Sequence, residues 1–109
     1  MGMAVVLTCV ARVRDWKRLE AIHRERLFGR VQAMGARRYQ IYRNAADAAE
    51  VLLVAELPHQ AAAVEIGQVL REELAGALTD REPDNKYWEA CGWEMPGQGS
   101  VEAALTWKG

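Results

Sequence analysis

Two segments of this 109-residue chain are largely apolar at both odd and even positions, and this feature constrains the fold most. They span residues 4–13 and 51–57. Successive side chains of a strand point to opposite faces, so a strand that is apolar on both faces is buried on both. Each segment is therefore predicted to be a central strand of a sheet, with apolar material above and below it.

A long helix is predicted between these two strands. It spans residues 15–34, with Asp15 as its N-cap and Gly35 as the residue that ends it. At about 100° per residue, four large apolar side chains form one stripe along the helix: Trp16, Leu19, Leu27 and Met34. His23 falls in the middle of this stripe, so a titratable group is expected to point at the sheet.

The rest of the chain continues to alternate strands and helices. The remaining predicted elements are a hairpin of strands at 36–43 and 50–57 around a loop at 44–50, a second helix from residue 59 or 60 to 78, a polar connection at 79–86, and a last strand at 87–94. Pro58 ends the second hairpin strand, because a proline cannot continue the ladder of hydrogen bonds.

The resulting order, β-α-β-β-α-β, predicts a ferredoxin-like α+β fold with a four-stranded antiparallel sheet and both helices on one face. Residues 1–95 are assigned to this domain and residues 96–109 to a C-terminal extension. Two helices cover only one face of the sheet, while two of its strands are apolar on both. A second copy of the same sheet is the simplest cover for the other face, so a homodimer is predicted.

Composition narrows the function mainly by exclusion. With 14 basic and 15 acidic residues the formal net charge is −1, without the basic excess that is typical of nucleic-acid-binding proteins. No segment approaches the ~20 apolar residues of a membrane span, and the start of the chain lacks the basic region of a signal peptide. We expect a cytoplasmic protein without nucleic-acid or membrane partners.

The two cysteines, Cys9 and Cys91, lie far apart in the sequence and lack the spacing of zinc or redox sites. The first and last strands of the predicted sheet are antiparallel neighbours, so these cysteines could lie close together. Free thiols are nonetheless expected, because the cytoplasm is reducing. With two scattered histidines and no nucleotide-binding motif, neither a metal nor another cofactor is predicted.

The chain resembles the dimeric α+β barrel superfamily, in particular the small antibiotic-biosynthesis-monooxygenase-like proteins. The resemblance rests on the helix opening at 15–17, on His23 and on the strand segments 35–43 and 50–56, and it covers residues 4–94. It implies a dimeric α+β barrel with a pocket in each subunit between the helices and the sheet. Relatives include cofactor-independent monooxygenases that act on aromatic polyketides, haem-degrading enzymes, cyclases and isomerases.

His23 is the candidate catalytic residue. A histidine that faces the sheet could act as a general acid or base near neutral pH. The competing interpretation is a buried neutral histidine held by a hydrogen bond, or one at the edge of the stripe that reaches water. His59, beside Pro58 at the start of the second helix, is expected to cap that helix or to be exposed.

The candidate substrate-binding residues are Trp16, Arg38, Tyr42 and Trp88. Strand alternation places Tyr42 on the face opposite Tyr39, and Trp88 on the face opposite Tyr87 and Trp93. One face lines a cavity under the helices and the other packs the dimer, and the sequence leaves open which is which. If the face of Tyr42 lines the cavity, Arg38 could hold an anionic oxygen of a flat aromatic ligand. Otherwise these residues are ordinary packing and exposed charge.

These residues and the family resemblance together suggest three functions. The first is a small cofactor-independent monooxygenase, or a cyclase or isomerase, for an aromatic or polyketide-like molecule, with His23 as base or electrostatic partner and a dry cavity that shields the carbanion. The second is a non-catalytic ligand-binding or assembly dimer. The third and weakest is haem binding through His23 or His59. A cavity of several hundred Å³ with His23 in its wall favours an enzyme, and a filled core favours the second function.

Overall fold

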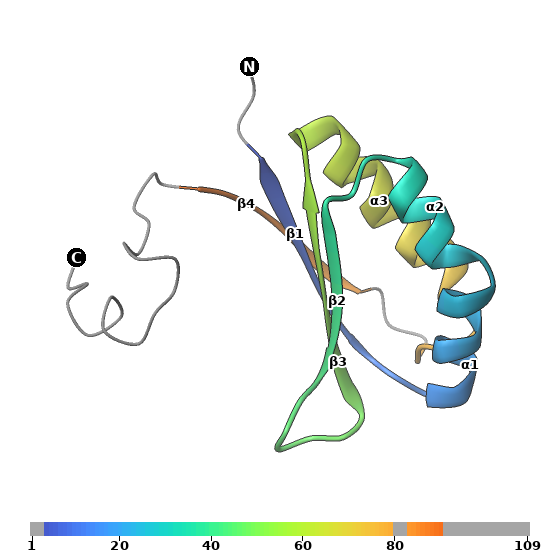
Figure 1. Cartoon of the computed structure of the whole chain (residues 1–109). Coiled ribbons are helices and arrows are strands. Elements are labelled where there is room, and N and C mark those ends of the chain that lie inside the picture. The colour runs from blue at the N-terminus through green and yellow to red at the C-terminus, as the bar shows by residue number, and fades with distance from the viewer. Residues whose placement is uncertain (1–3, 80–82, 91–109) are drawn as a thin grey trace, which may run out of the picture.

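The computed structural model describes residues 4–79 and 83–90, which form one antiparallel four-stranded sheet with helices packed on one of its faces (Figure 1). Along the chain the elements are β1 (Val5–Arg12), α1 (Trp16–Ile22), the π-helical turn η1 (His23–Leu27), α2 (Phe28–Ala33), β2 (Arg38–Arg43), β3 (Glu50–Leu57), α3 (Gln60–Glu73) and β4 (Asp84–Glu89). The strand order in the sheet is β2-β3-β1-β4. This confirms the predicted ferredoxin-like arrangement.

The two strands predicted to be central are central. β1 and β3 pair over their full length, from Val5 opposite Leu57 to Arg12 opposite Glu50, and β2 and β4 form the edges. The odd-numbered residues of β1 and β3 are buried on the face that the helices cover. The even-numbered residues, on the other face, are mostly only partly buried. The alternation therefore divides each strand into a core side and an open side.

The predicted long helix is one continuous helical segment made of α1, η1 and α2. The Asp15 carboxylate caps it by accepting a hydrogen bond from the backbone N–H of Arg18, at 3.0 Å. Gly35 follows its end with φ 97°, a left-handed conformation that glycine adopts without a steric penalty. The feature not predicted is η1, where the backbone N–H of Phe28 bonds to the carbonyl oxygen of His23, five residues earlier.

α3 lies beside this helical segment on the same face of the sheet (Figure 1). His59 caps it as expected, because its Nδ1 accepts a hydrogen bond from the backbone N–H of Ala62 at 3.2 Å. Glycine at position 67 lets α3 approach β4, since a Cβ there would lie 2.7 Å from the hydroxyl oxygen of Tyr87. The predicted end at Leu78 was wrong: α3 ends at Glu73, and Leu78 instead forms an isolated bridge with Val13.

Glu73 links α3 to the neighbouring helical segment in the same layer. Its carboxylate accepts hydrogen bonds from Arg26 at 2.6 Å and from Arg30 at 2.8 Å, both on the helical segment that precedes β2. These two guanidinium groups hold the pKa of Glu73 below its ordinary value. The last turn of α3 is thereby connected to η1 and α2.

The start predicted for the last strand was also wrong, whereas its predicted end at residue 94 lies outside the described residues. β4 begins at Asp84, inside the segment assigned to a polar connection, and ends at Glu89. Residues 84–86 pair with β1, with Asp84 opposite Val10, because backbone hydrogen bonds to a central strand do not require apolar side chains. Outside the described residues lie Cys91, Trp93 and the predicted extension at 96–109.

The core lies between the sheet and the helices. Its largest side chains are leucines and isoleucine from both layers: Leu7, Leu19, Leu27, Leu53, Leu57, Ile66, Leu70 and Leu74. Cys9 is a free thiol in this core, and burial raises its pKa to about 12. Within residues 4–79 and 83–90, His23 is the only buried polar side chain. No helix in these ranges is long and apolar enough to cross a membrane.

Candidate functional site

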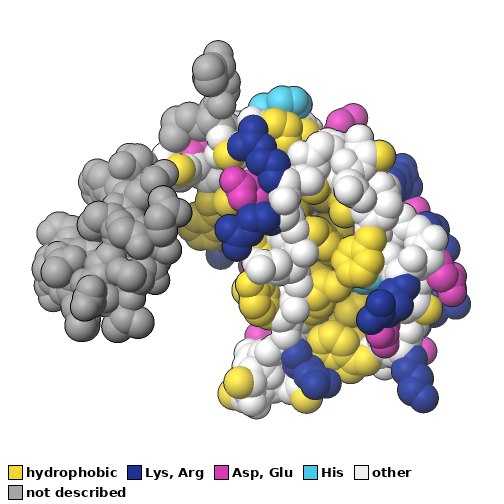
Figure 2. Space-filling view, viewed as in Figure 1, with side chains coloured by type: hydrophobic (Ala, Val, Ile, Leu, Met, Phe, Trp, Pro, Cys, Tyr) yellow, Lys and Arg dark blue, Asp and Glu magenta, His cyan; other side chains and the backbone are white. Residues whose placement is uncertain are grey.

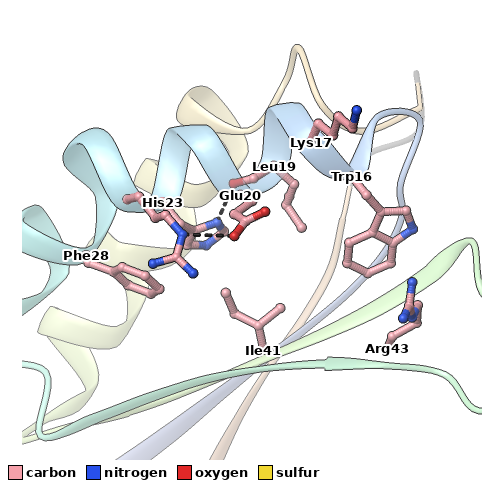
Figure 3. A pocket seen from close by; sticks show the side chains of 9 residues that line it. Trp16, Lys17, Leu19, Glu20, His23, Phe28, Ile41 and Arg43 are labelled. Atoms are coloured by element: carbon pink, nitrogen blue, oxygen red, sulfur yellow. Dashed lines mark hydrogen bonds and ion pairs between the residues drawn. The ribbon is translucent and has the colours of Figure 1, made fainter.

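An open cavity of about 440 Å³ lies between α1 and β2 (Figure 3). The residues that line it are Trp16, Lys17, Leu19, Glu20, His23, Arg24, Phe28, Ile41 and Arg43. Figure 3 shows Trp16 and Arg43 at one end, Phe28 at the other, and Ile41 on the floor between them. Figure 2 shows hydrophobic side chains gathered on this side of the molecule, with lysines and arginines around them. The cavity is a slot with aromatic ends and a charged rim.

His23 borders the slot but is only 1% exposed. Its Nδ1 lies 2.8 Å from the carbonyl oxygen of Leu19, and its Nε2 lies 2.7 Å from the hydroxyl oxygen of Tyr39. A carbonyl oxygen only accepts, so Nδ1 carries the proton, and Nε2 of the neutral ring accepts from the Tyr39 hydroxyl. Burial lowers the pKa of His23 below its ordinary value, although the bond to Leu19 opposes this shift. The imidazole is therefore neutral at pH 7.

Tyr39 and Phe28 enclose the imidazole. Their ring centroids lie 5.4 Å and 5.3 Å from that of His23, and 5.9 Å from each other. Burial raises the pKa of Tyr39 well above its ordinary value, so its hydroxyl stays protonated and can donate to His23. In a regular α-helix the side chains of residues 23 and 28 would point about 140° apart. The π-helical turn between them brings Phe28 onto the side of the helix that His23 occupies.

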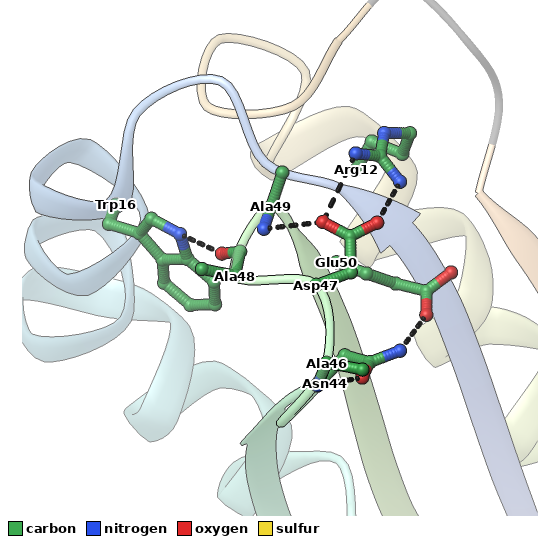
Figure 4. A network of polar contacts seen from close by, with 8 residues as sticks. All are labelled: Arg12, Trp16, Asn44, Ala46, Asp47, Ala48, Ala49 and Glu50. Atoms are coloured by element: carbon green, nitrogen blue, oxygen red, sulfur yellow. Dashed lines mark hydrogen bonds and ion pairs between the residues drawn. The ribbon is translucent and has the colours of Figure 1, made fainter.

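The loop between β2 and β3 holds Trp16 at the other end of the slot (Figure 4). The indole N–H donates to the carbonyl oxygen of Ala48 at 2.9 Å. In the same loop, Asp47 accepts a hydrogen bond from Arg12 at 2.8 Å, and this contact lowers the pKa of Asp47. The guanidinium carbon of Arg43 lies 5.3 Å from the centroid of the Trp16 ring. The position of the Trp16 ring thus depends on a loop held by hydrogen bonds and on the neighbouring guanidinium of Arg43.

The rim carries three cations against one carboxylate. Arg24 pairs with Glu20 at 2.9 Å, one helical turn earlier. Within the described ranges, Lys17 and Arg43 form no ion pair with a carboxylate. The end of the slot at Trp16 is therefore electropositive, whereas the end at Phe28 is apolar.

Of the residues predicted from the sequence, the structure brings His23 and Trp16 to this cavity. The other three, Arg38, Tyr42 and Trp88, lie on the open face of the sheet. β2 alternates, so Tyr39 faces the helices and its neighbours Arg38 and Tyr42 face away. Trp88 lies opposite Val6, a residue of the open side of β1. The question that the sequence left open is thereby answered: the face of Tyr39 is the cavity side.

Solved structures of low sequence identity share this fold. A monooxygenase from the gene ActVA-Orf6 of Streptomyces coelicolor, solved with the ligand nanaomycin D, is 16% identical with a TM-score of 0.63, over 86% of this chain and 93% of that one. SnoaB, a cofactor-independent oxygenase from Streptomyces nogalater, is 15% identical with a TM-score of 0.61, over 87% and 99%. The fold is that of the antibiotic-biosynthesis-monooxygenase-like proteins. A dimeric ferredoxin-like protein from an uncultured marine organism is 14% identical with a TM-score of 0.56, over 84% and 91%.

The superfamily resemblance predicted from the sequence is confirmed at the level of the fold. No protein-family model matches the sequence, and no curated protein sequence matches it. Identities of this size carry no residue roles, so the chemistry of this chain follows only from its own side chains.

Sequence reasoning missed Arg43 and Phe28 as residues of the site. Arg43 shares a strand face with Tyr39 and Ile41. Strand alternation would have indicated this residue once that face was known to be buried. For Phe28 the signal is weaker. Four of the five buried positions of the helical segment recur every four residues, at Leu19, His23, Leu27 and Val31, with Ile22 as the fifth, whereas an α-helix turns every 3.6 residues. This longer spacing indicates a wider turn.

The side chains of this site can support proton transfer and the binding of a flat apolar molecule. Within residues 4–79 and 83–90, no group of three His, Cys, Asp or Glu side chains could hold a metal ion. What the slot supplies is a neutral imidazole paired with a tyrosine hydroxyl, two aromatic ends and an electropositive rim.

Proposed function

We propose that this chain binds a flat aromatic, polyketide-like molecule in the slot between α1 and β2 and oxidises it as a cofactor-independent monooxygenase. The observation that carries the proposal is an open cavity of about 440 Å³ with His23 in its wall. The volume is in the range of small-molecule sites, whereas a filled core would favour a purely structural role for the histidine. SnoaB, which shares the fold, is described as a cofactor-independent oxygenase.

A monooxygenase without a cofactor takes all its electrons from the substrate. Reduction of O2 consumes four electrons: one oxygen atom becomes a carbonyl oxygen on the substrate, and the other leaves as water. A CH2 group thereby becomes a C=O group, and the atoms balance without an external reductant. Removal of a proton from this CH2 group gives the carbanion that reacts with O2, and an apolar slot protects this carbanion from water.

His23 is the proton acceptor in this proposal. A substrate proton passes to the hydroxyl oxygen of Tyr39 while the tyrosine proton passes to Nε2 of His23, across the observed 2.7 Å. The carbonyl oxygen of Leu19, already bonded to Nδ1–H, stabilises the imidazolium that forms. The lowered pKa of His23 keeps the ring neutral, and so able to accept a proton, near pH 7.

The proposed active form is a homodimer joined through the open faces of the two sheets. Tyr42 and Trp88 are 46% and 51% exposed on this face, large values for aromatic side chains. Their polar atoms bond to neighbours on the same face, Tyr42 to Gln40 at 2.8 Å and Trp88 to Thr8 at 2.7 Å. These hydrogen bonds orient both rings, and the apolar surface of the rings remains available for contact with a second subunit. Arg38 belongs to the same proposed interface.

Anthrone is a suitable test substrate because its CH2 group lies between two aromatic rings and opposite a carbonyl. Loss of one proton gives a delocalised anion, and the reaction with one O2 yields anthraquinone and water. We expect the protein to accelerate O2 consumption, measured with an oxygen electrode at pH 7. His23→Ala and Tyr39→Phe are expected to lower kcat by about 10²–10⁴, the usual range for a lost general base.

Tyr42→Phe is the matched control, because it removes the same hydroxyl from the opposite face of the same strand. It is expected to keep the kcat of the unmodified protein. Equal kcat values for the unmodified protein, His23→Ala and Tyr39→Phe would overturn the assignment of His23 as proton acceptor.

A non-catalytic ligand-binding or assembly protein is the second candidate, and one observation favours it: both ring nitrogens of His23 already have hydrogen-bond partners. In that case anthrone binds without accelerated O2 consumption, and Tyr39→Phe lowers stability alone. A product formed without O2 uptake would indicate a cyclase or isomerase. Titration with hemin tests the third possibility, because the absence of a Soret shift removes haem binding.

A further inference from the structure

We infer that the slot selects aromatic molecules that carry a carboxylate, and that Arg43 binds this carboxylate. The inference rests on the proposed aromatic ligand and adds to it a charge and the residue that recognises it. Neither the established fold nor the paired His23 and Tyr39 requires an anionic ligand. The inference therefore depends on the distribution of charge along the slot.

The charges at the two ends of the slot differ. Glu20 lies above the middle of the slot in Figure 3, and its carboxylate pairs with Arg24 at 2.9 Å, so these two charges offset each other. His23 adds no charge near pH 7, because its pKa is lowered. Lys17 and Arg43 remain, and in Figure 3 both lie toward the end occupied by Trp16. An aromatic molecule with one anionic end would bind with this end toward Arg43 and its rings toward Phe28.

Arg43 is positioned as a binding group at this end. It is the last residue of β2, opposite the buried Val51, so its side chain rises from the floor of the slot on the same face as Ile41. Its guanidinium lies 5.3 Å from the centroid of Trp16, whose indole is held by the carbonyl of Ala48. Contact with an aromatic ring uses none of the five N–H donors of the guanidinium, which can bind both oxygens of a carboxylate.

Apolar surface completes the recognition. Ile41 forms the floor between the two ends and Leu19 lies on the helix side, so a planar ring system meets apolar side chains above and below. The slot thus combines one cation with a flat apolar volume. An aromatic carboxylate satisfies both, whereas a neutral aromatic leaves the guanidinium without an anionic partner.

The test compares two probes of the same shape, 2-naphthoate and 2-naphthamide, by isothermal titration calorimetry at pH 7 and low salt. The unmodified protein is expected to bind 2-naphthoate about ten- to a hundredfold more tightly, the usual value of a charged hydrogen-bonded contact. Arg43→Gln is expected to remove this preference and to leave the affinity for 2-naphthamide unchanged. Arg43→Lys is expected to keep part of the preference, because it keeps the charge but loses the planar fork.

Two further variants locate the effect. Arg37→Gln removes the same charge from an exposed position that directly precedes the first residue of β2. This variant is expected to bind both probes as the unmodified protein does. Ile41→Trp fills the floor of the slot and is expected to weaken binding of both probes. Circular dichroism of each variant verifies that it is folded.

The outcomes separate this inference from the proposed function. Equal affinity of both probes for the unmodified protein, or a preference for 2-naphthoate that survives in Arg43→Gln, would overturn the role of Arg43 and leave the aromatic site standing. Failure of both probes to bind would remove the aromatic site itself, and the carboxylate preference with it. Binding that is unaffected by Ile41→Trp would place the probes elsewhere and equally overturn the inference.

Discussion

His23 keeps both hydrogen bonds in its neutral form, and this links the stability of the fold to pH. In an unfolded chain the imidazole titrates near its ordinary pKa of about 6.5. In the folded chain burial lowers the pKa, so protonation is delayed until the pH is lower. Between the two pKa values the unfolded chain binds a proton that the folded chain does not, and protons then favour unfolding.

The contribution of His23 to the free energy of unfolding is therefore expected to be largest above about pH 7. It is expected to fall as the pH drops through 6.5 toward the pKa of His23 in the folded chain. One proton limits the slope to about 1.4 kcal/mol per pH unit. Urea unfolding at pH 7.5, 6.5 and 5.5 measures this slope. His23→Gln is expected to be less stable at pH 7.5 but to show a shallower slope.

The carboxyl groups with lowered pKa values do not change stability in the pH range of this measurement. Asp47 and Glu73 lose their contribution only below about pH 4.5, where carboxyl groups of the unfolded chain begin to protonate. Identical slopes for the unmodified protein and His23→Gln would mean that His23 titrates alike in both states.

At the scale of single residues, the sequence predicted where a side chain points better than which residue it contacts. The helical period alone indicated that His23 faces the sheet. It could not indicate that Tyr39 is the partner, because strand alternation defines two faces without saying which one the helices cover. Arg38 and Arg43 show the same limit: both are arginines of one strand, and only the packed helices distinguish the open face from the cavity.

At the scale of elements, two glycines of the helical segment and its end test the backbone conformation. A Cβ on Gly29, inside α2, would meet no atom within 4 Å, so Gly29→Ala is expected to stabilise the fold by about 0.5–1 kcal/mol. Gly35 has φ 97°, where a Cβ is strained, so Gly35→Ala is expected to destabilise by about 1–2 kcal/mol.

Urea unfolding of the two variants measures both signs against the unmodified protein. The substitutions are chemically identical and six positions apart, so each is a control for the other. Destabilisation by Gly29→Ala would indicate that α2 is less regular than the structure describes, and an unchanged stability of Gly35→Ala would mean that the left-handed turn is not required.

Elements with a strong periodic signal were predicted well, and elements without one were not. β1 and β3 are apolar on both faces. Asp15 caps the start of the helical segment between β1 and β2, and Gly35 follows its end, as is common at helix termini. The first half of β4 is polar, and an edge strand is held by backbone hydrogen bonds that leave no pattern in the side chains. The end of α3 was missed because apolar residues continue past Glu73 into a turn.

At the scale of the whole molecule, the uncovered sheet face predicts association. The order of elements was enough to predict one layer of helices and one of strands, but it does not show what lies on the second face. That face combines partly buried aliphatic residues of β1 and β3 with the exposed rings of Tyr42 and Trp88. Apolar surface of this kind on a small domain is usually covered by a partner.

Sedimentation velocity at micromolar concentration is expected to show a dimer. Val54 lies in the middle of β3 on the open face, so Val54→Arg is expected to shift the equilibrium toward the monomer by placing a charge in the interface. Gln68→Arg adds the same charge to the exposed side of α3 and is expected to remain dimeric. A single-chain mass for the unmodified protein at all concentrations would contradict the dimer.

The π-helical turn has a consequence for how such chains diverge. It accommodates one residue more than the same length of α-helix, so it has the character of an insertion retained within a helix. Loss of one residue between 23 and 28 would return the helix to its regular winding and place the phenylalanine four positions after the histidine, about 40° away on the same side of the helix. The aromatic neighbour of the histidine and every strand of the sheet would therefore survive a single deletion, and only the side chains between these two residues would change direction. Chains of this architecture could in this way gain or lose the wide turn without any exchange of residue type at the histidine itself.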